Sequence, residues 1–263
     1  MKFFLAPMQG LTGYTVRNAF HHHFDYIDKY YTPFIPAAKR MNAKIKRDID
    51  PVNNDGITLI PQAMSIVADE VNDLHRQLVP YGYDEINVNL GCPSGTVVSK
   101  KRGSGILAYP DMLDSFLDEL YTKADFPVSI KTRVGFNDDE LWPKLIEIYS
   151  KYPISELTVH PRVQKDFYKN QPNLGAFHDA VEESKIPLCY NGDIFTPENY
   201  EEMKREFPKV DTFMLGRGIL MNPALLDLIR MREKTDVKKT TDIDVTEWKK
   251  EETLRKMQSA DRY

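Results

Sequence analysis

Short apolar runs alternate with helix-like segments along most of the chain. Each run is four to six residues long and rich in Ile, Val, Leu, Phe or Tyr, as is typical of strands covered on both faces. We predict strands at residues 3–7, 26–30, 58–62, 85–90, 128–132, 156–160, 188–191 and 212–215.

Amphipathic segments between these runs predict helices at residues 68–80, 110–123, 138–152 and 197–207. Pro110 and Pro197 suit the first turn of a helix, where a missing N–H costs nothing. In the second unit, residues 33–54 contain prolines and mixed charge, so that a helix there is only a guess. Repeated strand–helix units predict parallel strands with right-handed crossovers, and eight units predict an α/β fold of the (β/α)₈ TIM-barrel type.

The pattern changes after Pro223. Residues 225–233 continue as a helix, residues 234–244 are polar and Thr-rich like a loop, and residues 245–262 read as one more polar helix. We therefore expect a catalytic barrel domain at 1–223 and a short C-terminal helical segment at 224–263.

Composition narrows the class of protein. The chain has 263 residues, 41% of them hydrophobic, which suits one large domain with a sizeable core. No run approaches the roughly 20 apolar residues of a membrane span, and the first residues lack the apolar length of a signal peptide. Two cysteines in different contexts fit a reducing, cytoplasmic location. The net charge of −4 means that any nucleic-acid binding must depend on local cationic patches.

Seven of the eight predicted strands end in residues that a packed core would not select. These ends are Pro7-Met8-Gln9-Gly10, Gln62, Asn89 to Cys92, Lys131 with Arg133, His160 with Arg162, Asn191-Gly192-Asp193, and Gly216-Arg217-Gly218. In a TIM barrel the carboxyl ends of the strands meet at one mouth, where active sites lie. We therefore predict that these residues converge.

The strand ends suggest specific chemistry. Cys92 is a lone thiol between a Gly and a Pro, able to exchange a proton with a ligand, whereas Cys189 lies in an apolar run and reads as core. Lys131 is a cation in an apolar strand and fits an anionic ring or a phosphate. The glycine-rich ends of the last two strands, with Arg217, fit phosphate binding. No dinucleotide fingerprint or metal-ligand spacing occurs, and the run of histidines at 21–23 reads as a solvated helix end.

The order and spacing of these motifs resemble the tRNA-dihydrouridine synthases. The resemblance covers about residues 5–225 and is most specific at Asn89-Leu90-Gly91-Cys92-Pro93, followed by the segment from Lys100 to Leu107. It implies an FMN-containing barrel that reduces uridines in tRNA with NADPH, without a metal, a membrane or an obligate protein partner.

The resemblance also implies residue roles. Cys92 would be the catalytic proton donor. The implied cofactor-binding residues are Pro7, Met8, Gln9, Gln62, Lys131, His160, Asn191, Gly192, Asp193, Gly216 and Arg217. The implied substrate-binding residues are Asn89, Arg133, Arg162, Lys100, Lys101 and Arg102. Relatives of this kind continue into a helical RNA-binding domain, and we expect residues 224–263 to be its reduced or truncated counterpart.

Three other interpretations remain open. A dihydroorotate dehydrogenase-like enzyme shares the barrel, the FMN and a similar cysteine segment. A Schiff-base aldolase would use Lys131 as its nucleophile. An RNA-binding module without catalysis would keep the barrel alone.

Overall fold

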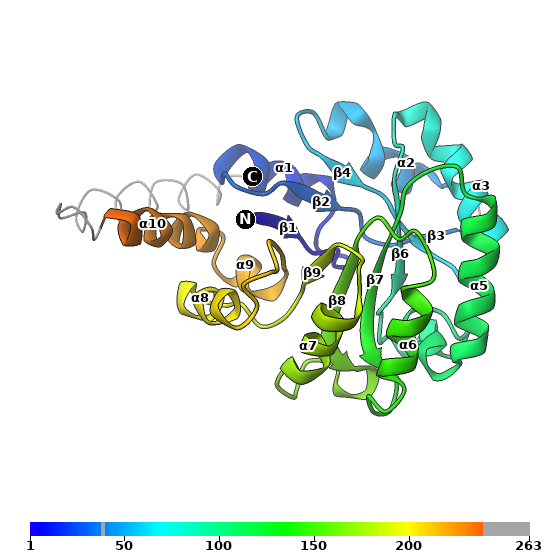
Figure 1. Ribbon diagram of the computed structural model, residues 1–263. Coiled ribbons are helices and arrows are strands. Elements are labelled where there is room, and N and C mark those ends of the chain that lie inside the picture. Colours follow the sequence, from blue (N-terminus) through cyan, green and yellow to red (C-terminus); the bar gives the residue numbers. More distant parts are fainter. Residues whose placement is uncertain (38–39, 239–263) are drawn as a thin grey trace.

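The computed structural model describes residues 1–37 and 40–238, and its centre is a closed barrel of parallel strands (Figure 1). The strands are β1 (Lys2–Leu5), β2 (Lys29–Tyr31), β3 (Ile35–Pro36), β4 (Leu59–Ile60), β5 (Gln62–Met64), β6 (Ile86–Leu90), β7 (Val128–Gly135), β8 (Leu157–Val163), β9 (Leu188–Tyr190) and β10 (Thr212–Leu215). Their order is β3-β5-β6-β7-β8-β9-β10-β1-β2-β4. Because β2 pairs with β4 and β3 with β5, the ten strands occupy eight positions and the barrel closes.

Two strand predictions shift for local reasons. The strand predicted at 26–30 begins only at Lys29, because Tyr26 has a positive φ of 79°, which is incompatible with an extended strand. The run 58–62 is divided at Pro61, which has no N–H to donate to a sheet. The predicted fold class is confirmed.

Helices surround the barrel (Figure 1). They are α1 (Tyr14–His23), α2 (Ala43–Ile49), α3 (Ala68–Leu78), α4 (Gly95–Val98), α5 (Pro110–Lys123), α6 (Trp142–Tyr149), α7 (Leu174–Glu183), α8 (Pro197–Glu206), α9 (Arg217–Met221) and α10 (Leu225–Lys238). Prolines occupy the first turns of α5 and α8, as predicted. α6 is shorter than the predicted 138–152, and α10 extends to Lys238, so the loop predicted at 234–244 is wrong for its first residues.

Alternation along each strand divides the core into two layers. In β1, Phe3 and Leu5 pack in the large cluster beneath the helices, whereas Phe4 joins Cys189 and Met214 in a small cluster inside the barrel. Successive side chains of a strand point to opposite faces, which produces this division. Cys189 is fully buried, as its apolar surroundings predicted.

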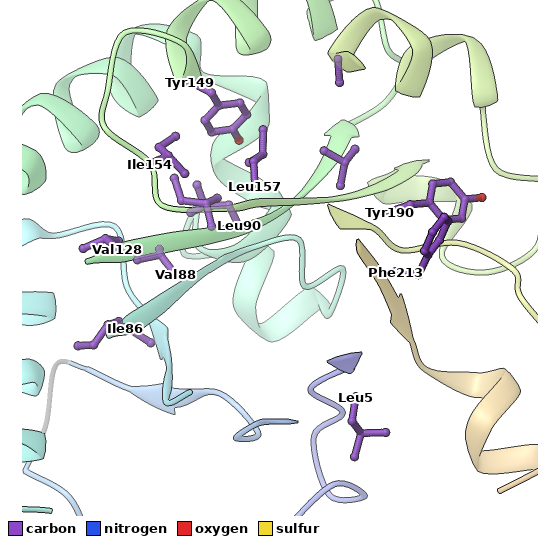
Figure 2. Close-up of a cluster of buried hydrophobic side chains, with 14 of the residues drawn as sticks. Leu5, Ile86, Val88, Leu90, Val128, Tyr149, Ile154, Leu157, Tyr190 and Phe213 are labelled. Atoms are coloured by element: carbon purple, nitrogen blue, oxygen red, sulfur yellow. The ribbon is translucent and has the colours of Figure 1, made fainter. Parts of the chain in front are cut away.

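The outer layer contains most of the buried apolar surface. Figure 2 shows Ile86, Val88 and Leu90 of β6 beside Val128 and Leu157 of the next two strands. Burial of one such aliphatic side chain contributes roughly 1.5–3 kcal/mol. Since the apolar residues of β6 take this face, its alternate residues must point into the barrel.

The start of α10 also belongs to this layer. Leu225, Leu226 and Ile229 are buried in the large cluster, and Arg230 donates to the backbone oxygen of Met1 at 2.9 Å. The helix predicted at 245–262 lies outside the described residues, and a division between 1–223 and 224–263 stays a prediction. In the described part of the chain, no helix is long and apolar enough to cross a bilayer.

Candidate active site

A cavity of about 450 Å³ opens at the carboxyl ends of the strands. Its volume lies within the usual range for small-molecule sites. It is lined by Pro7, Met8, Gln9, Leu11, Phe34, Gln62, Asn89, Gly91, Cys92, Pro93, Lys131, Arg133, His160, Tyr168, Asn191 and Arg217. Residues from seven of the predicted strand ends therefore share one space.

Sheet register explains why these side chains meet. Asn89 of β6 pairs with Lys131 of β7, and Arg133 of β7 pairs with His160 of β8. Alternate residues of these strands, among them Leu90, Ile130 and Val159, pack in the cluster beneath the helices, so the polar residues between them face inward. The parallel register thus places Asn89 beside Lys131, and Arg133 beside His160 two residues further along β7.

Asn89 holds the turn that carries Cys92. Its Oδ1 accepts hydrogen bonds from the backbone N–H of Gly91 at 3.1 Å and of Cys92 at 2.9 Å. The Cys92 carbonyl in turn accepts from the N–H and the hydroxyl of Ser104, at 3.1 and 2.8 Å. A side chain at Gly103 would place its Cβ 2.7 Å from that carbonyl oxygen, so only glycine allows this close approach. The thiol therefore sits on a firmly held backbone.

A chain of polar side chains runs from this turn down the interior of the barrel. Asn89 donates to Gln62 Oε1 at 2.8 Å, Gln62 donates to Asn87 Oδ1 at 2.8 Å, and Asn87 donates to Ser129 Oγ at 3.0 Å. Ser129 then donates to Glu85 at 2.7 Å. Each buried amide is satisfied by its neighbour, which fixes the orientation of Asn89.

Cys92 is a half-buried free thiol facing the cavity. Burial raises the pKa of Cys92 above its ordinary value, although Arg133 and Lys131 partly oppose this effect. The thiol is therefore protonated at neutral pH and is suited to donate a proton.

Lys131 is the most strongly perturbed cation in the cavity. Its Nζ donates to Asn191 Oδ1 at 2.6 Å, and in residues 1–37 and 40–238 it forms no ion pair with a carboxylate. Burial, reinforced by the charge of Arg133, lowers the pKa of Lys131 to about 7. An ammonium in this setting is stabilised by an anionic ligand.

His160 is neutral and has a defined tautomer. Burial and the nearby charges of Arg133 and Lys131 lower its pKa well below the ordinary value. Its Nδ1 lies 2.6 Å from the backbone oxygen of Asn191, which only accepts, so Nδ1 carries the proton. The lone pair of Nε2 then faces Arg162, 3.5 Å away.

Asp193 joins two arginines beside the cavity. The Arg162 guanidinium is almost fully buried and donates to Asp193 Oδ1 at 3.0 Å and to Asn170 O at 2.6 Å. Arg217 also forms an ion pair with Asp193. Arg162 does not line the cavity, whereas Arg217 does. In this arrangement the Asp193 carboxylate orients both guanidinium groups.

The Arg133 guanidinium donates hydrogen bonds to backbone carbonyls. It donates to the carbonyls of Gly91, Val163 and Phe167 at 3.0, 2.9 and 2.9 Å. It thereby ties the Cys92 turn to the segment that follows β8. This side chain lines the cavity, yet its hydrogen bonds are already committed to the fold.

Some lining residues were not predicted from the sequence. They are Leu11, Phe34, Pro93 and Tyr168. Tyr168 lies 4.6 Å from the guanidinium of Arg217, measured to the ring centroid, and follows Phe167, whose φ is 50°. The sequence did contain one indication of this role, because Phe167 and Tyr168 are adjacent aromatic residues in a polar loop soon after the strand of His160.

Two predicted glycines differ in how closely the chain packs around them. A Cβ at Gly192 would fall 2.0 Å from the hydroxyl oxygen of the buried Tyr190, and a Cβ at Gly216 would contact Ala6 at 3.4 Å. Gly192 is therefore required by packing, whereas Gly216 has room for an ordinary contact.

The predicted cationic run lies apart from the cavity lining. Arg102 pairs with Glu70 at 3.1 Å, Lys101 is exposed with Nζ 4.3 Å from the ring centroid of Tyr109, and Lys100 is exposed. Whether these side chains contact a substrate stays a prediction. In the described ranges, no three His, Cys, Asp or Glu side chains gather as a metal site would require.

Comparison with known proteins identifies relatives of this chain. A family model described as dihydrouridine synthase matches residues 4–262. The chain is 28% identical over 233 residues to tRNA-dihydrouridine synthase B of Pasteurella multocida, covering 85% of this chain and 67% of that protein. It is 31% identical over 140 residues to tRNA-dihydrouridine synthase B of Vibrio parahaemolyticus, covering 53% of this chain and 43% of that protein.

A probable tRNA-dihydrouridine synthase of Staphylococcus aureus is 30% identical over 175 residues, which cover 59% of this chain and 52% of that protein. The matches thus span about half to two thirds of the length of these relatives. Among solved structures, a variant of NCR from Zymomonas mobilis superposes with a TM-score of 0.59 over 88% of this chain and 86% of that one. At 11% identity this likeness shows the fold alone. Because the family model extends over nearly every residue, the chain belongs to the dihydrouridine synthase family.

Proposed function

We propose that this protein reduces uridines of tRNA to 5,6-dihydrouridine, with FMN as its cofactor. The observation that carries the proposal is a protonated thiol, Cys92, held in the same cavity as Lys131, a cation that has no carboxylate partner among the described residues. The family membership and the names of the relatives agree with this assignment. Among the interpretations considered above, they favour the synthase over a dihydroorotate dehydrogenase-like enzyme.

The residues present fit FMN. Lys131 would offer positive charge to the flavin ring and would favour its reduced form. Pro7, Met8 and Gln9 lie on the cavity wall contributed by the end of β1, and Gln62 and Asn191 supply amides. Gly192, Gly216 and Arg217 would hold the phosphate, while His160 and Asp193 support Asn191 and Arg217. When bound and reduced, FMN supplies the hydride for C6 of the uracil.

The chain itself supplies the proton. Charge accumulates on C5 and O4 of the uracil during reduction, and the Cys92 thiol donates a proton at C5. Asn89 fixes the thiol through two backbone N–H groups. We assign NADPH as the source of electrons and the cytoplasm as the location. We also propose Asn89, Arg133 and Arg162 as supports of the uracil site and Lys100, Lys101 and Arg102 as contacts to RNA outside it.

The target base must leave its stack to reach the cavity, at a cost of a few kcal/mol. Mass spectrometry of tRNA nucleosides from cells lacking this chain, and then regaining it, tests the function. We expect one or more dihydrouridines to disappear and return. Unchanged dihydrouridine content would overturn the proposal.

A second candidate rests on one observation. The low pKa of Lys131 suits a Schiff-base nucleophile as well as a flavin contact. An aldolase of this kind would be colourless and would be trapped by borohydride with a carbonyl substrate. A flavin absorbance band in the purified protein, without borohydride trapping, excludes it.

Replacing Lys131 with methionine should stabilise the flavin-free protein at pH 7. The folded-state pKa is about 7 against an ordinary value of 10.5, so the unfolded chain binds more protons between these values. Stability from this group therefore rises with pH across that window. We expect Lys131→Met to raise the free energy of unfolding by about 1–3 kcal/mol at pH 7. This is less than the full pKa shift of Lys131 implies, because the residue keeps some exposure to solvent. The gain should shrink toward pH 10.

Urea unfolding at pH 7 and pH 9.5 measures this difference. Lys185→Met, at an exposed lysine, is the matched control and should change little. The same Lys131→Met protein should bind FMN more weakly. A less stable variant at pH 7 would contradict the expected gain and would mean that the hydrogen bond to Asn191 outweighs the cost of burying the charge.

A further inference from the structure

A second groove of about 470 Å³ adjoins the cavity on its outer side. The two spaces share a wall formed by Gln9, Leu11 and Phe34. The rest of the groove is lined by Gly10, Gly13, Tyr14, Thr15, Pro33, Ile35, Pro36, Asn42, Lys44, Ile45, Arg47 and Asp48. The groove is therefore continuous with the proposed active site.

Helix α2 gives this groove its charge. Lys44 and Arg47 lie three residues apart, on one side of the helix, and both line the groove. Both are exposed, and within the described part of the chain neither forms an ion pair. By contrast, Arg102 of the predicted cationic run is paired with Glu70. The cations of α2 remain available to phosphates.

Asp48 is the one carboxylate among the described residues that line the groove, and it is already paired with a cation. Asp48 pairs with the fully buried Arg17 at 3.2 Å and accepts from the Tyr14 N–H at 2.7 Å. Arg17 also donates to the Thr12 carbonyl at 2.9 Å, which braces the base of the shared wall. The floor is thus rigid and the groove has a net positive face.

Aromatic and apolar side chains complete the surface. Tyr14 and Phe34 are half-buried, and the Arg47 guanidinium lies 5.9 Å from the Tyr14 ring centroid. Leu11 is 55% exposed on the shared wall. Cations beside aromatic faces are the usual composition of grooves that hold single-stranded nucleic acid, and exposed apolar side chains can keep bases apart.

We propose that this groove binds the nucleotide next to the target uridine, with Lys44 and Arg47 on its phosphates and Tyr14 against its base. The RNA strand crosses the Gln9–Leu11 wall, so that the target base enters the cavity and its neighbour occupies the groove. This inference rests on the proposed function, since it requires an RNA substrate.

Binding of an unmodified tRNA transcript at several salt concentrations tests the proposal. The double variant Lys44→Ala/Arg47→Ala should bind about tenfold or more weakly at low salt, and the dependence of log K on log salt should flatten by about 0.7 per lost phosphate contact. Lys46→Ala is the matched control, because Lys46 is an exposed cation of α2 outside the groove lining. Tyr14→Ala should weaken binding without changing the salt dependence.

The outcomes separate the two proposals. Wild-type protein that binds tRNA but forms no dihydrouridine contradicts the proposed function, while the affinities of the variants still decide the role of the groove. Equal affinity and salt dependence in the double variant and wild type would overturn the inference. So would an unchanged tRNA affinity with a raised KM for NADPH, which would assign the groove to the dinucleotide. FMN content should be equal in all variants.

Discussion

Replacement of Cys92 by alanine should stop dihydrouridine formation and leave FMN bound and reducible. The thiol faces the cavity, and the turn beneath it is held by Asn89 and Ser104 through backbone groups that the substitution leaves in place. A general acid contributes about 10²–10⁴-fold to a rate. Single-turnover formation of dihydrouridine on a tRNA transcript, with flavin reduction followed separately, measures both expectations.

The second cysteine provides the matched control. Cys189 is fully buried inside the barrel, so Cys189→Ala makes the same substitution at a thiol that a substrate cannot reach. It should reduce stability but keep the rate per bound flavin. An undiminished rate in Cys92→Ala would remove the proton-donor role from this residue.

The pH dependence adds an independent readout. Burial raises the pKa of Cys92, and a donor must be protonated to act, so the rate should be steady through neutral pH and fall as pH rises through the thiol pKa. The residual rate of Cys92→Ala should lack this alkaline decline.

Asp193→Ala should cause the largest loss of stability among the site residues. Among the described residues, it leaves the buried Arg162 guanidinium with Asn170 O and His160 Nε2 as hydrogen-bond partners and removes the ion-pair partner of Arg217. Breaking a buried ion pair costs about 3–5 kcal/mol, and partial exposure of Asp193 places our expectation near 3 kcal/mol. Urea unfolding of the flavin-free protein measures this loss.

Two further variants sharpen this expectation. Asp193→Asn keeps an acceptor for Arg162 and should lose less. Asp125→Ala, at an exposed carboxylate, should change stability by under about 0.5 kcal/mol. A loss below about 1 kcal/mol for Asp193→Ala would mean that water or another group compensates Arg162.

Part of the cavity was predictable because the periodicity of a strand is visible in its local sequence and the topology of a parallel barrel is shared by all members of the fold. Polar residues at the carboxyl ends of parallel strands must share one mouth, and Cys92, Lys131 and His160 do. Residues on irregular loops, such as Tyr168 and Leu11, carry no such period, so their entry into the cavity depends on contacts distant in sequence.

The amino-acid sequence by itself determined the class of fold, the strand ends that bear chemistry and the contrast between a cavity cysteine and a core cysteine. These properties follow from residue type and spacing along one chain. Only the tertiary structure decided which partners the polar atoms have. Asn89 accepts hydrogen bonds from the Cys92 turn, Arg133 donates to three backbone carbonyls, and Asp193 pairs with two arginines. It also placed Lys44 and Arg47 of α2, which form no ion pair within the described ranges, beside the cavity. Hydrogen bonds and ion pairs depend on distances between segments, and the sequence leaves these distances undefined.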